Sequence, residues 1–321
     1  MGLSVVRFEL EGAPTWGVIS NNKIHRITQP FAHQRDLLKT YFDDPKAFAS
    51  LIDERPLEQN VPFLSPLLES TQLFAQGLNY ASHREESGIE EEAGENLIFS
   101  KASSSISGPN DPIVRPKGCE LLDYEIELGV VLKKDIAEET EVTEHNLHEY
   151  VGALVLCNDV SARDFMFGAP MMQWFKGKGQ RTFCPTGPVL YLLDAHEREL
   201  LTELRLTLSV NEEVRQDATT DQLIFKPHET LTELASFTDV HKGDMLLTGT
   251  PGGVILNADL KVGLAILLNF TNDEKRRNKL VKSQQAVRYL QPGDRLTLTL
   301  QDRSGSLDFG TQTTGVRDAT A

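Results

Sequence analysis

The chain has 321 residues, of which 40% are hydrophobic and 25% are charged, a balance typical of a globular protein with a sizeable core. Its 32 lysines and arginines stand against 47 aspartates and glutamates, which gives a formal net charge of −15. Because such a surface repels phosphate backbones and anionic headgroups, nucleic acid and membranes are excluded as expected partners, and an anionic substrate would need a local cationic site.

The expected compartment of the protein is inferred from its targeting signals and its cysteines. The first residues, MGLSVVRFELEGAP, contain no basic leader followed by an apolar run, so no secretory signal is expected. No run of about 18 apolar residues predicts a membrane span. The three cysteines, Cys119, Cys157 and Cys184, are widely separated, which argues against a disulfide framework. We therefore expect a cytoplasmic protein.

Residues 1–70 are predicted to form a small N-terminal α+β domain. Alternating apolar residues predict strands at 4–10, 15–20 and 23–27, separated by polar turns. Helical spacing over 34–54 is interrupted by Pro45. Prolines crowd the connector that follows, so we place a domain boundary near residue 70 and assign residues 71–321 to a second domain.

The second domain is predicted to be mostly β-structure. Its apolar, β-branched runs are TQLFAQGL, YEIELGVVL, VGALVLCNDV, GPVLYLL, LRLTLSV, GDMLLTGT and DRLTLTL. Short polar helices are expected at 82–95 and 220–236, and the mixed-charge segment 271–286 is expected to be a solvated loop or helix. The pattern predicts a mixed, β-rich α+β fold.

Three acidic residues border predicted strands. Glu125 and Glu127 open an apolar strand, so alternation puts both carboxylates on one face while Ile126 enters the core. Two such carboxylates repel each other unless a cation lies between them, although a solvated acidic strand face is also common. Asp159 follows another buried strand, where it would either cap a turn or supply a third oxygen ligand. Three carboxylates suit Mg²⁺ or Mn²⁺ better than zinc.

Other polar groups are candidates for catalysis. On a helix, His83 and Glu86 would be neighbours, and a carboxylate paired with imidazole makes a base that activates water, although such surface pairs are also common without function. Lys178 lies in a glycine-punctuated predicted loop, where it would neutralise a substrate oxyanion or simply be solvated. The Gly-rich turn at 248–253 offers backbone N–H groups and the Thr250 hydroxyl to a carboxylate.

The order of these segments resembles the fumarylacetoacetate hydrolase family over about residues 70–300. The motifs, in order, are G-L-N-Y-x-x-H-x-x-E, D-Y-E-x-E-L, N-D-x-S-A-R-D, Q-W-x-x-G-K with P-x-G-P, and G-D-x-L-x-T-G-T-P-x-G-V. The resemblance implies the family's β-sandwich roll, preceded by the small N-terminal domain common in bacterial members. It also implies a homodimer with one Mg²⁺ or Mn²⁺ per subunit.

The resemblance implies roles for individual residues. The implied metal ligands are Glu125, Glu127 and Asp159, and the implied catalytic residues are His83, Glu86 and Lys178. The implied substrate contacts are Tyr80, Arg163, Gly249 and Thr250, with Asp164 near the metal. The expected reaction is hydrolysis of a carbon–carbon bond in a small anionic 2,4-dioxo acid, an acylpyruvate or fumarylacetoacetate-like compound, through a metal-bound enolate. The alternatives are an oxaloacetate-type decarboxylase, an oxo-acid isomerase, or an inactive member that serves as a binding protein.

The chain departs from the family pattern around Lys178. Members commonly read G-K-S-F-D-T-F, whereas residues 177–183 read GKGQRTF, so Gln180 is unusual and Arg181 replaces an aspartate. We expect this reversed charge to alter substrate preference. The segment expected to close over substrate is also extended and acidic, with Glu90, Glu91, Glu92 and Glu95.

Overall fold

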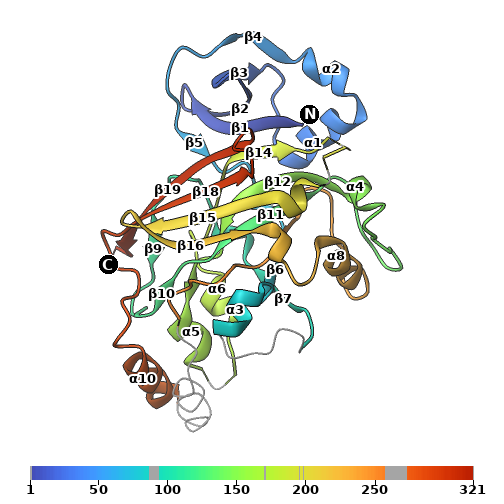
Figure 1. Ribbon diagram of the computed structural model, residues 1–321. Coiled ribbons are helices and arrows are strands. Elements are labelled where there is room, and N and C mark those ends of the chain that lie inside the picture. Colours follow the sequence, from blue (N-terminus) through green and yellow to red (C-terminus); the bar gives the residue numbers. More distant parts are fainter. Residues whose placement is uncertain are drawn as a thin grey trace.

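Two stacked β-sheets form the body of the molecule (Figure 1). The computed structural model describes residues 2–86, 94–169, 171–194, 196–197, 199–256 and 273–320. Within this part of the chain the fold is the β-rich α+β fold that the sequence predicts.

The larger sheet runs through the centre of the molecule. Its strands are β1 (Leu3–Leu10), β2 (Ala13–Ser20), β3 (Lys23–Ile27), β4 (Ile52–Pro56), β5 (Phe63–Leu64), β6 (Leu73–Gly77), β7 (Leu97–Lys101), β8 (Ile106–Ser107), β11 (Ile126–Leu132), β12 (Val151–Asn158), β14 (Cys184–Leu192) and β17 (Met245–Leu247). They pair in the order β4-β3-β2-β1-β14-β12-β11-β17-β6-β7, with β5 joined to β1 and β8 joined to β14. The strands β11 and β12, which lead into the candidate site, are therefore central.

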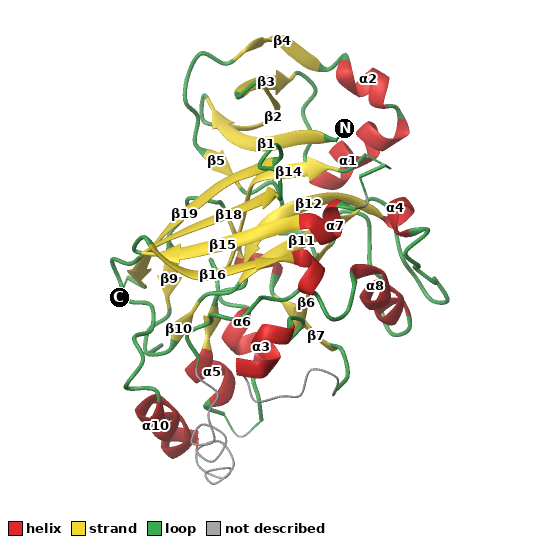
Figure 2. Ribbon diagram, viewed as in Figure 1, coloured by secondary structure: helices red, strands yellow, loops and turns green. Residues whose placement is uncertain are grey.

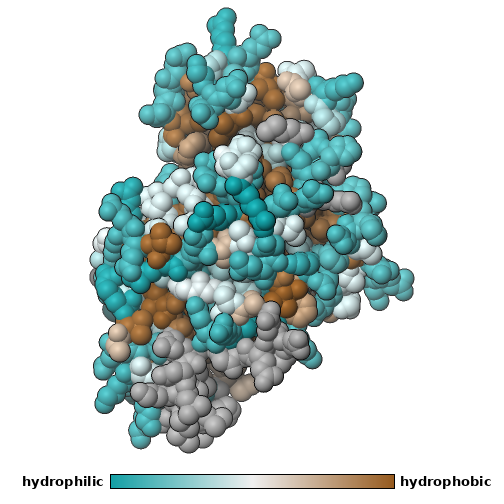
Figure 3. Space-filling view, in the orientation of Figure 1, coloured by the Kyte–Doolittle hydropathy of each residue, from teal (hydrophilic) through white to brown (hydrophobic). Residues whose placement is uncertain are grey.

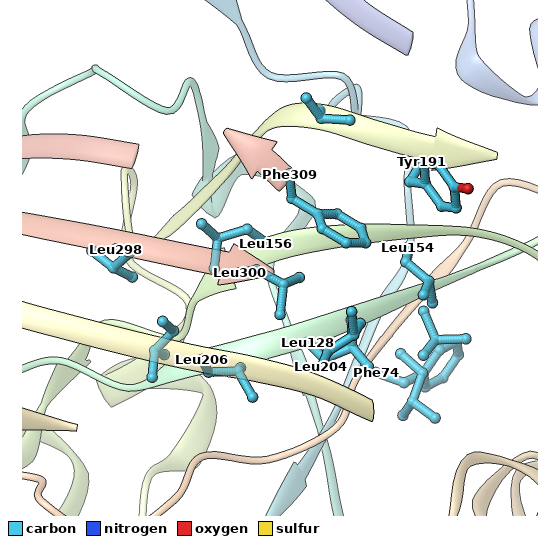
Figure 4. Packing of buried hydrophobic residues seen from close by; sticks show 14 of the residues in the cluster. Phe74, Leu128, Leu154, Leu156, Tyr191, Leu204, Leu206, Leu298, Leu300 and Phe309 are labelled. Atoms are coloured by element: carbon cyan, nitrogen blue, oxygen red, sulfur yellow. The ribbon is translucent and has the colours of Figure 1, made fainter. Parts of the chain in front are cut away.

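A smaller sheet packs against one face of the larger one. Its strands are β9 (Ile113–Arg115), β15 (Leu204–Val210), β16 (Glu213–Thr219), β18 (Arg295–Asp302) and β19 (Asp308–Asp318), in the order β16-β15-β18-β19-β9. The short strands β10 (Leu122–Asp123) and β13 (Ser161–Ala162) pair separately. Figure 4 shows the leucine-rich core between the sheets, with Leu128, Leu154 and Leu156 on one side and Leu204, Leu206, Leu298, Leu300 and Phe309 on the other.

Both faces of β11 are buried because its residues alternate between two cores. Leu128 and Val130 face the smaller sheet, whereas Val131 faces a second core. The helices α1 (Gln34–Asp43) and α2 (Pro45–Ala49) cover that second core. Because both faces of the strand are buried, its sequence is almost continuously apolar and does not alternate between apolar and polar residues.

The N-terminal strands extend the larger sheet. Strand β1 pairs antiparallel with β14, and Val5 lies opposite Leu190. The boundary near residue 70 thus lies between segments that share a sheet and a core, and it stays a prediction. The helix predicted over 34–54 is wrong beyond residue 49, because residues 52–56 form β4 and pair with β3.

The remaining helices are short and mostly lie outside the sheets (Figure 2). They are α3 (Ala81–Glu86), α4 (Leu147–Tyr150), α5 (Arg163–Phe167), α6 (Trp174–Lys178), α7 (Leu200–Glu203), α8 (Pro227–Ala235) and α10 (Asp273–Ser283), with 3₁₀ turns η1 (Ser103–Ser105) and η2 (Thr220–Gln222). Figure 2 shows α3, α5 and α6 gathered at one end of the molecule, beside β6 and β7. That end carries the candidate site.

Several helix predictions need correction. The predicted loop around Lys178 is helix α6, and the helix expected over 220–236 begins only at Pro227. The helix expected over 82–95 is seen as α3, and residues 87–93 of that prediction lie outside the described residues. Helix α10 covers most of 271–286, but it is not simply solvated, since Leu280 is buried in a small apolar cluster.

The face drawn in Figure 3 is mainly hydrophilic, with separate apolar patches. Of the helices that the structure describes, none has both the length and the apolar character needed to cross a membrane.

Candidate metal centre and active site

The three predicted carboxylate ligands meet where β11 begins and β12 ends. Glu125 directly precedes β11, Glu127 lies within it, and Asp159 directly follows β12. The Asp159 N–H donates to the Glu125 carbonyl at 2.8 Å, which fixes the two residues side by side. Each residue offers one carboxylate oxygen, and these three oxygens lie within 4.8 Å of one another. All three side chains are buried.

Buried cations balance two of the carboxylates. Lys178 Nζ donates to Glu125 Oε2 at 2.5 Å and to Asp159 Oδ2 at 2.6 Å. Arg163 Nη2 donates to Glu125 Oε1 at 2.5 Å. Lys101 Nζ donates to Asp159 Oδ1 and, at 2.5 Å, to the carbonyl of Lys178. Removing any one of these cations would leave the carboxylate that it binds with a single cationic partner, which weakens the compensation of a buried charge.

The pKa values follow from these ion pairs. Burial alone would raise the pKa of Glu125, but Lys178 and Arg163 outweigh it and lower that pKa to about 2. Burial alone would lower the pKa of Lys178, but Asp159 and Glu125 outweigh it and raise that pKa above its usual value. Both groups are therefore charged at neutral pH.

Glu127 differs from its neighbours because it forms no ion pair with a lysine or arginine among the described residues. Its Oε2 accepts from the Gly249 N–H at 2.8 Å, whereas its buried Oε1 accepts no hydrogen bond from the described residues. Burial, and then the charges of Asp159 and Glu125, raise the pKa of Glu127 well above its usual value. An unpaired carboxylate oxygen facing two other carboxylates is costly for the protein alone but is a ready ligand for a cation.

The donor set fits one hard divalent cation. All the converging atoms of the triad are carboxylate oxygens, which Mg²⁺ and Mn²⁺ prefer, and neither a thiolate nor an imidazole joins the described triad. Cys157 and Cys184 are buried and free, and burial raises the pKa of both thiols, so thiolate ligands are disfavoured. The residues present are compatible with the expected metal.

The Gly-rich turn holds Glu127 through its backbone. Gly249 has φ +92°, and a Cβ at this position would lie 2.7 Å from the Cβ of Asn79, so no other residue fits. The next residue, Thr250, lines the site but already uses its hydroxyl. Its Oγ1 donates to the Ile126 carbonyl at 2.9 Å and accepts from Gln216 Nε2 at 2.8 Å.

The G-L-N-Y segment locks the end of β6 onto this turn. Asn79 Nδ2 donates to the Thr248 carbonyl at 2.8 Å, and Asn79 Oδ1 accepts from the Phe225 N–H at 2.7 Å. Leu78, just before it, has φ +53°, a left-handed conformation that such contacts stabilise. Tyr80 is buried against Ala218 and Leu223 and does not line the cavity. Its implied contact with substrate stays a prediction.

His83 and Glu86 both lie on α3, but the expected hydrogen bond between them is not formed. Both Glu86 oxygens accept from the Gly253 N–H at 2.9 Å, and the side chain is exposed. His83 is buried, and its Nδ1 has no hydrogen-bond partner among the described residues. Burial, together with Arg163 and Lys178, lowers the pKa of His83 to about 4 despite the charge of Glu125. The imidazole is thus neutral at pH 7.

Arg163 and Asp164 are adjacent in sequence but hold different parts of the site. Arg163 Nε donates to Asp123 Oδ2 at 2.9 Å, in addition to its bond with Glu125. Asp164 instead accepts from the Glu120 N–H at 3.1 Å and from Arg277 Nη2 at 2.6 Å. Asp164 therefore anchors a loop and α10 and is not part of the carboxylate triad.

A cavity of about 320 Å³ opens above these groups. Its described lining includes the polar or charged residues Gln76, His83, Glu125, Arg163, Lys178 and Thr250. Its other side chains are Leu78, Leu97, Met166, Phe167, Met172, Trp174 and Leu256. Arg181 is exposed and does not belong to the described lining, so the reversed charge contacts neither triad nor cavity. Glu90, Glu91 and Glu92 lie outside the described residues, and Glu95 is exposed.

Sequence reasoning missed three residues that support the site. Lys101 ends β7, Gln216 lies in the polar strand β16, and Asp123 precedes the metal-site strand. Gln216 Oε1 accepts from the Ile126 N–H at 3.0 Å, and Asp123 accepts from Arg163. The available signal was weak: a lysine at the end of the short run LIFSK, and an aspartate two residues before the first glutamate of the E-x-E pair.

Comparison with protein families decides the relationship. Residues 72–317 match the family model described as fumarylacetoacetate (FAA) hydrolase C-terminal. The chain belongs to the fumarylacetoacetate hydrolase family.

Relatives of known activity in this family catalyse different reactions. The mitochondrial oxaloacetate tautomerase FAHD2A of Bos taurus is 36% identical over 209 residues, which are 65% of this chain and 64% of that protein. The 2,4-didehydro-3-deoxy-L-rhamnonate hydrolase of Sphingomonas sp. (strain SKA58) is 36% identical over 200 residues, which are 62% of this chain and 68% of that protein. The match therefore spans less than two thirds of the tautomerase.

Solved structures in the fumarylacetoacetate hydrolase family match the whole chain. The fumarylacetoacetate hydrolase of Exiguobacterium antarcticum has a TM-score of 0.76 at 26% identity, covering 99% of this chain and 100% of that one. A probable 2-hydroxyhepta-2,4-diene-1,7-dioate isomerase from Mycobacterium abscessus has a TM-score of 0.74 at 26% identity and covers 100% of both chains. The likeness thus includes the N-terminal strands.

Proposed function

We propose that this family member is a divalent-metal-dependent enzyme that hydrolyses a carbon–carbon bond in a small anionic 2,4-dioxo acid of the acylpyruvate type. One observation carries the proposal: the unpaired Glu127 oxygen completes a buried carboxylate triad beneath a cavity that a neutral His83 lines. A metal site and an uncharged base are the two elements that this hydrolysis needs.

The triad would hold one Mg²⁺ or Mn²⁺. When bound, that cation supplies Lewis-acid polarisation of the substrate's oxo group. Arg163 and Lys178 already hold Glu125 in place, and Gly249 does the same for Glu127. The protein's own hydrogen bonds therefore orient these ligands, which limits the ordering cost of binding a cation.

His83 would act as the general base. Its imidazole lines the cavity and is uncharged at pH 7, so it is able to accept a proton from water. The hydroxyl adds to the C4 carbonyl, the C3–C4 bond breaks, and a proton adds to C3, which yields pyruvate and a carboxylic acid. Lys178 lines the cavity and would stabilise the oxyanion that develops at C4. Glu86 would orient His83 only after releasing the Gly253 N–H.

A second candidate is tautomerisation of an oxo acid. It needs one base that moves a proton at C3 and no attacking water, so it does not require the His83–Glu86 hydrogen bond that is absent here. The 36% identity to an oxaloacetate tautomerase supports the same reading. Decarboxylation of an oxaloacetate-like acid is the third outcome that an assay should distinguish.

A product assay separates these reactions. With Mg²⁺ or Mn²⁺ present, we expect acetylpyruvate to give acetate and pyruvate, and we expect His83→Ala and Glu125→Ala to lose at least 100-fold in kcat/KM. Glu85→Ala, an exposed neighbour on α3, is the matched control and should retain activity. Unchanged turnover in both site variants would rule out the assignment. Enol–keto interconversion or CO₂ release from oxaloacetate without acetylpyruvate cleavage would favour an alternative.

The assembly and metal loading of the protein can be checked separately. The homodimer and the cytoplasmic location stay predictions, and analytical sedimentation would test whether the protein is a dimer.

Calorimetry with Mg²⁺ and Mn²⁺ tests the alternative that the protein is an inactive family member that only binds a ligand. Absence of binding by either ion would favour a binding protein over an enzyme.

A further inference from the structure

Building on the proposed hydrolase function, we infer that the part of the substrate beyond its oxo-acid head is apolar and uncharged, such as an alkyl or aryl acyl group. The inference concerns the apolar side chains that line the cavity together with the charged groups. Three features of the cavity support it: its apolar wall, the pairing of its cations, and the exposed apolar side chains at its rim.

The wall of the cavity is built from apolar side chains on separate elements. Leu97 begins β7, Met166 and Phe167 end α5, and Trp174 begins α6. The Trp174 ring packs against Phe99 of β7 with ring centroids 5.0 Å apart, so the wall is braced. A substrate tail in this region would be surrounded largely by hydrocarbon and aromatic atoms, which reward burial of apolar surface.

The cations of the cavity are already paired. Among the described lining residues only Arg163 and Lys178 carry a positive charge, and both donate to Glu125 at 2.5 Å. Arg163 also binds Asp123, and Lys178 also binds Asp159. A second substrate carboxylate would therefore have to be desolvated without a free cation, which is costly.

The rim of the cavity is also apolar. Of the described large hydrophobic side chains that are exposed, Leu97 and Met172 line the cavity. Exposed apolar side chains gathered beside a charged site mark a contact surface for an apolar group.

Calorimetry on the Mg²⁺- or Mn²⁺-loaded protein tests the inference without requiring turnover. The probes are pyruvate, 2-oxohexanoate, phenylpyruvate and 2-oxoglutarate, which share a head and differ in their tails. Because each buried methylene contributes up to about fourfold in affinity, we expect 2-oxohexanoate to bind at least 10-fold tighter than pyruvate. Phenylpyruvate should also bind more tightly than pyruvate, whereas 2-oxoglutarate should bind no more tightly than pyruvate. A preference for 2-oxoglutarate, equal binding of all four, or binding of none overturns the inference.

Two neighbouring methionines provide matched variants. Met172 lines the cavity and is 55% exposed, whereas Met171 is 67% exposed and lies outside the described lining. We expect Met172→Arg to weaken 2-oxohexanoate binding by at least fivefold and to strengthen 2-oxoglutarate binding. Met171→Arg adds the same charge and should leave both affinities within about twofold. Equal effects of the two variants would mean that the cavity wall does not select the tail.

Turnover separates this inference from the function on which it rests. We expect hexanoylpyruvate to have a higher kcat/KM than acetylpyruvate. If the apolar 2-oxo acids bind more tightly but neither acylpyruvate is cleaved, the hydrolase proposal fails and the apolar tail site stands. If both are cleaved with equal kcat/KM and the 2-oxo acids show no preference, the hydrolase stands and the tail inference fails.

Discussion

The two lysines beside Asp159 occupy different sides of its carboxylate. Lys178 binds Oδ2 and also reaches Glu125, whereas Lys101 binds Oδ1 and the Lys178 carbonyl. Lys101 does not line the cavity and so is a positioning residue. We expect Lys101→Met to weaken Mn²⁺ binding about 10- to 100-fold, because outer partners of metal ligands contribute that much.

Calorimetry measures the Mn²⁺ affinity of the Lys101 variant. The matched control is Lys39→Met, since Lys39 forms only an exposed pair with Asp43. The control should bind Mn²⁺ like the parent protein. If Lys101→Met also binds normally, Asp159 is held without its second lysine.

His83 should give an unusual pH profile. Because burial lowers its pKa to about 4, the neutral imidazole persists as pH falls through 6.5, where an ordinary histidine would become protonated. We expect kcat/KM for acetylpyruvate at pH 5.5 to stay within about threefold of its pH 7 value. A pH–rate profile checks this. His83→Asn should be at least 100-fold slower throughout, whereas His228→Asn, outside the cavity, should match the parent. An acid limb near pH 6.5 would contradict the neutral-base role.

The site residues show which features of the site could be predicted from local sequence spacing. The period-two spacing of Glu125 and Glu127 correctly places them on one face of a strand, because alternation is a local property of the backbone. The three-residue spacing of His83 and Glu86 predicts a hydrogen bond that is not formed, because the Gly253 N–H binds the carboxylate instead. That contact spans 167 residues of sequence, so no local pattern reports it.

The Gly-rich turn after β17 is predicted to tolerate no side chain at Gly249. Gly249→Ala would meet both an unfavourable φ and a Cβ 2.7 Å from that of Asn79. We expect a loss of about 2–4 kcal/mol in unfolding free energy and weaker Mn²⁺ binding, because the N–H of residue 249 holds Glu127. Chemical denaturation and calorimetry measure the two effects.

Gly118 supplies the control for that prediction. It also has positive φ, +80°, but a Cβ there would meet nothing within 4 Å. Gly118→Ala should therefore cost only about 1 kcal/mol and leave Mn²⁺ binding intact. Equal losses in the two variants would mean that backbone conformation alone, and not the contact with Asn79, makes Gly249 necessary.

Elements with strong apolar patterns were predicted well, and those fixed by pairing were not. Strands β11, β12 and β15 follow continuous or alternating apolar runs, which predict strands directly. Strand β16 has an exposed, polar sequence, and only its ladder with β15 makes it a strand. Strand β4 likewise forms by pairing with β3 where the local spacing favoured a helix.

At the scale of the whole molecule, stability should depend on the metal. A cation that binds only the folded triad stabilises the protein by about 2.7 kcal/mol when its concentration is 100 times its Kd. We therefore expect Mn²⁺ to raise the Tm and EDTA to reverse the rise. Glu127→Gln keeps an oxygen acceptor for the Gly249 N–H, so its Tm in EDTA should be no lower than that of the parent.

Thermal unfolding with and without Mn²⁺ measures both the Mn²⁺-dependent rise in Tm and the Tm of Glu127→Gln in EDTA. Glu127→Gln should lose most of the Mn²⁺-dependent rise in Tm, because it lacks one of the three carboxylates. Glu54→Gln, an exposed change of the same kind, should keep it. A full Mn²⁺ response in Glu127→Gln would mean that the cation binds elsewhere.

The pairing of β1 with β14 bears on how the chain avoids self-association. Without residues 1–70, β14 would present unpaired backbone groups along Val189–Leu192, and Val155 and Leu190 would lose the apolar cover of α1 and α2. An open strand edge beside an apolar face recruits further copies of the same chain. We expect a chain shortened to begin at residue 71 to aggregate into large particles, which light scattering would detect. On this view, residues 1–70 prevent aggregation by covering the edge of β14.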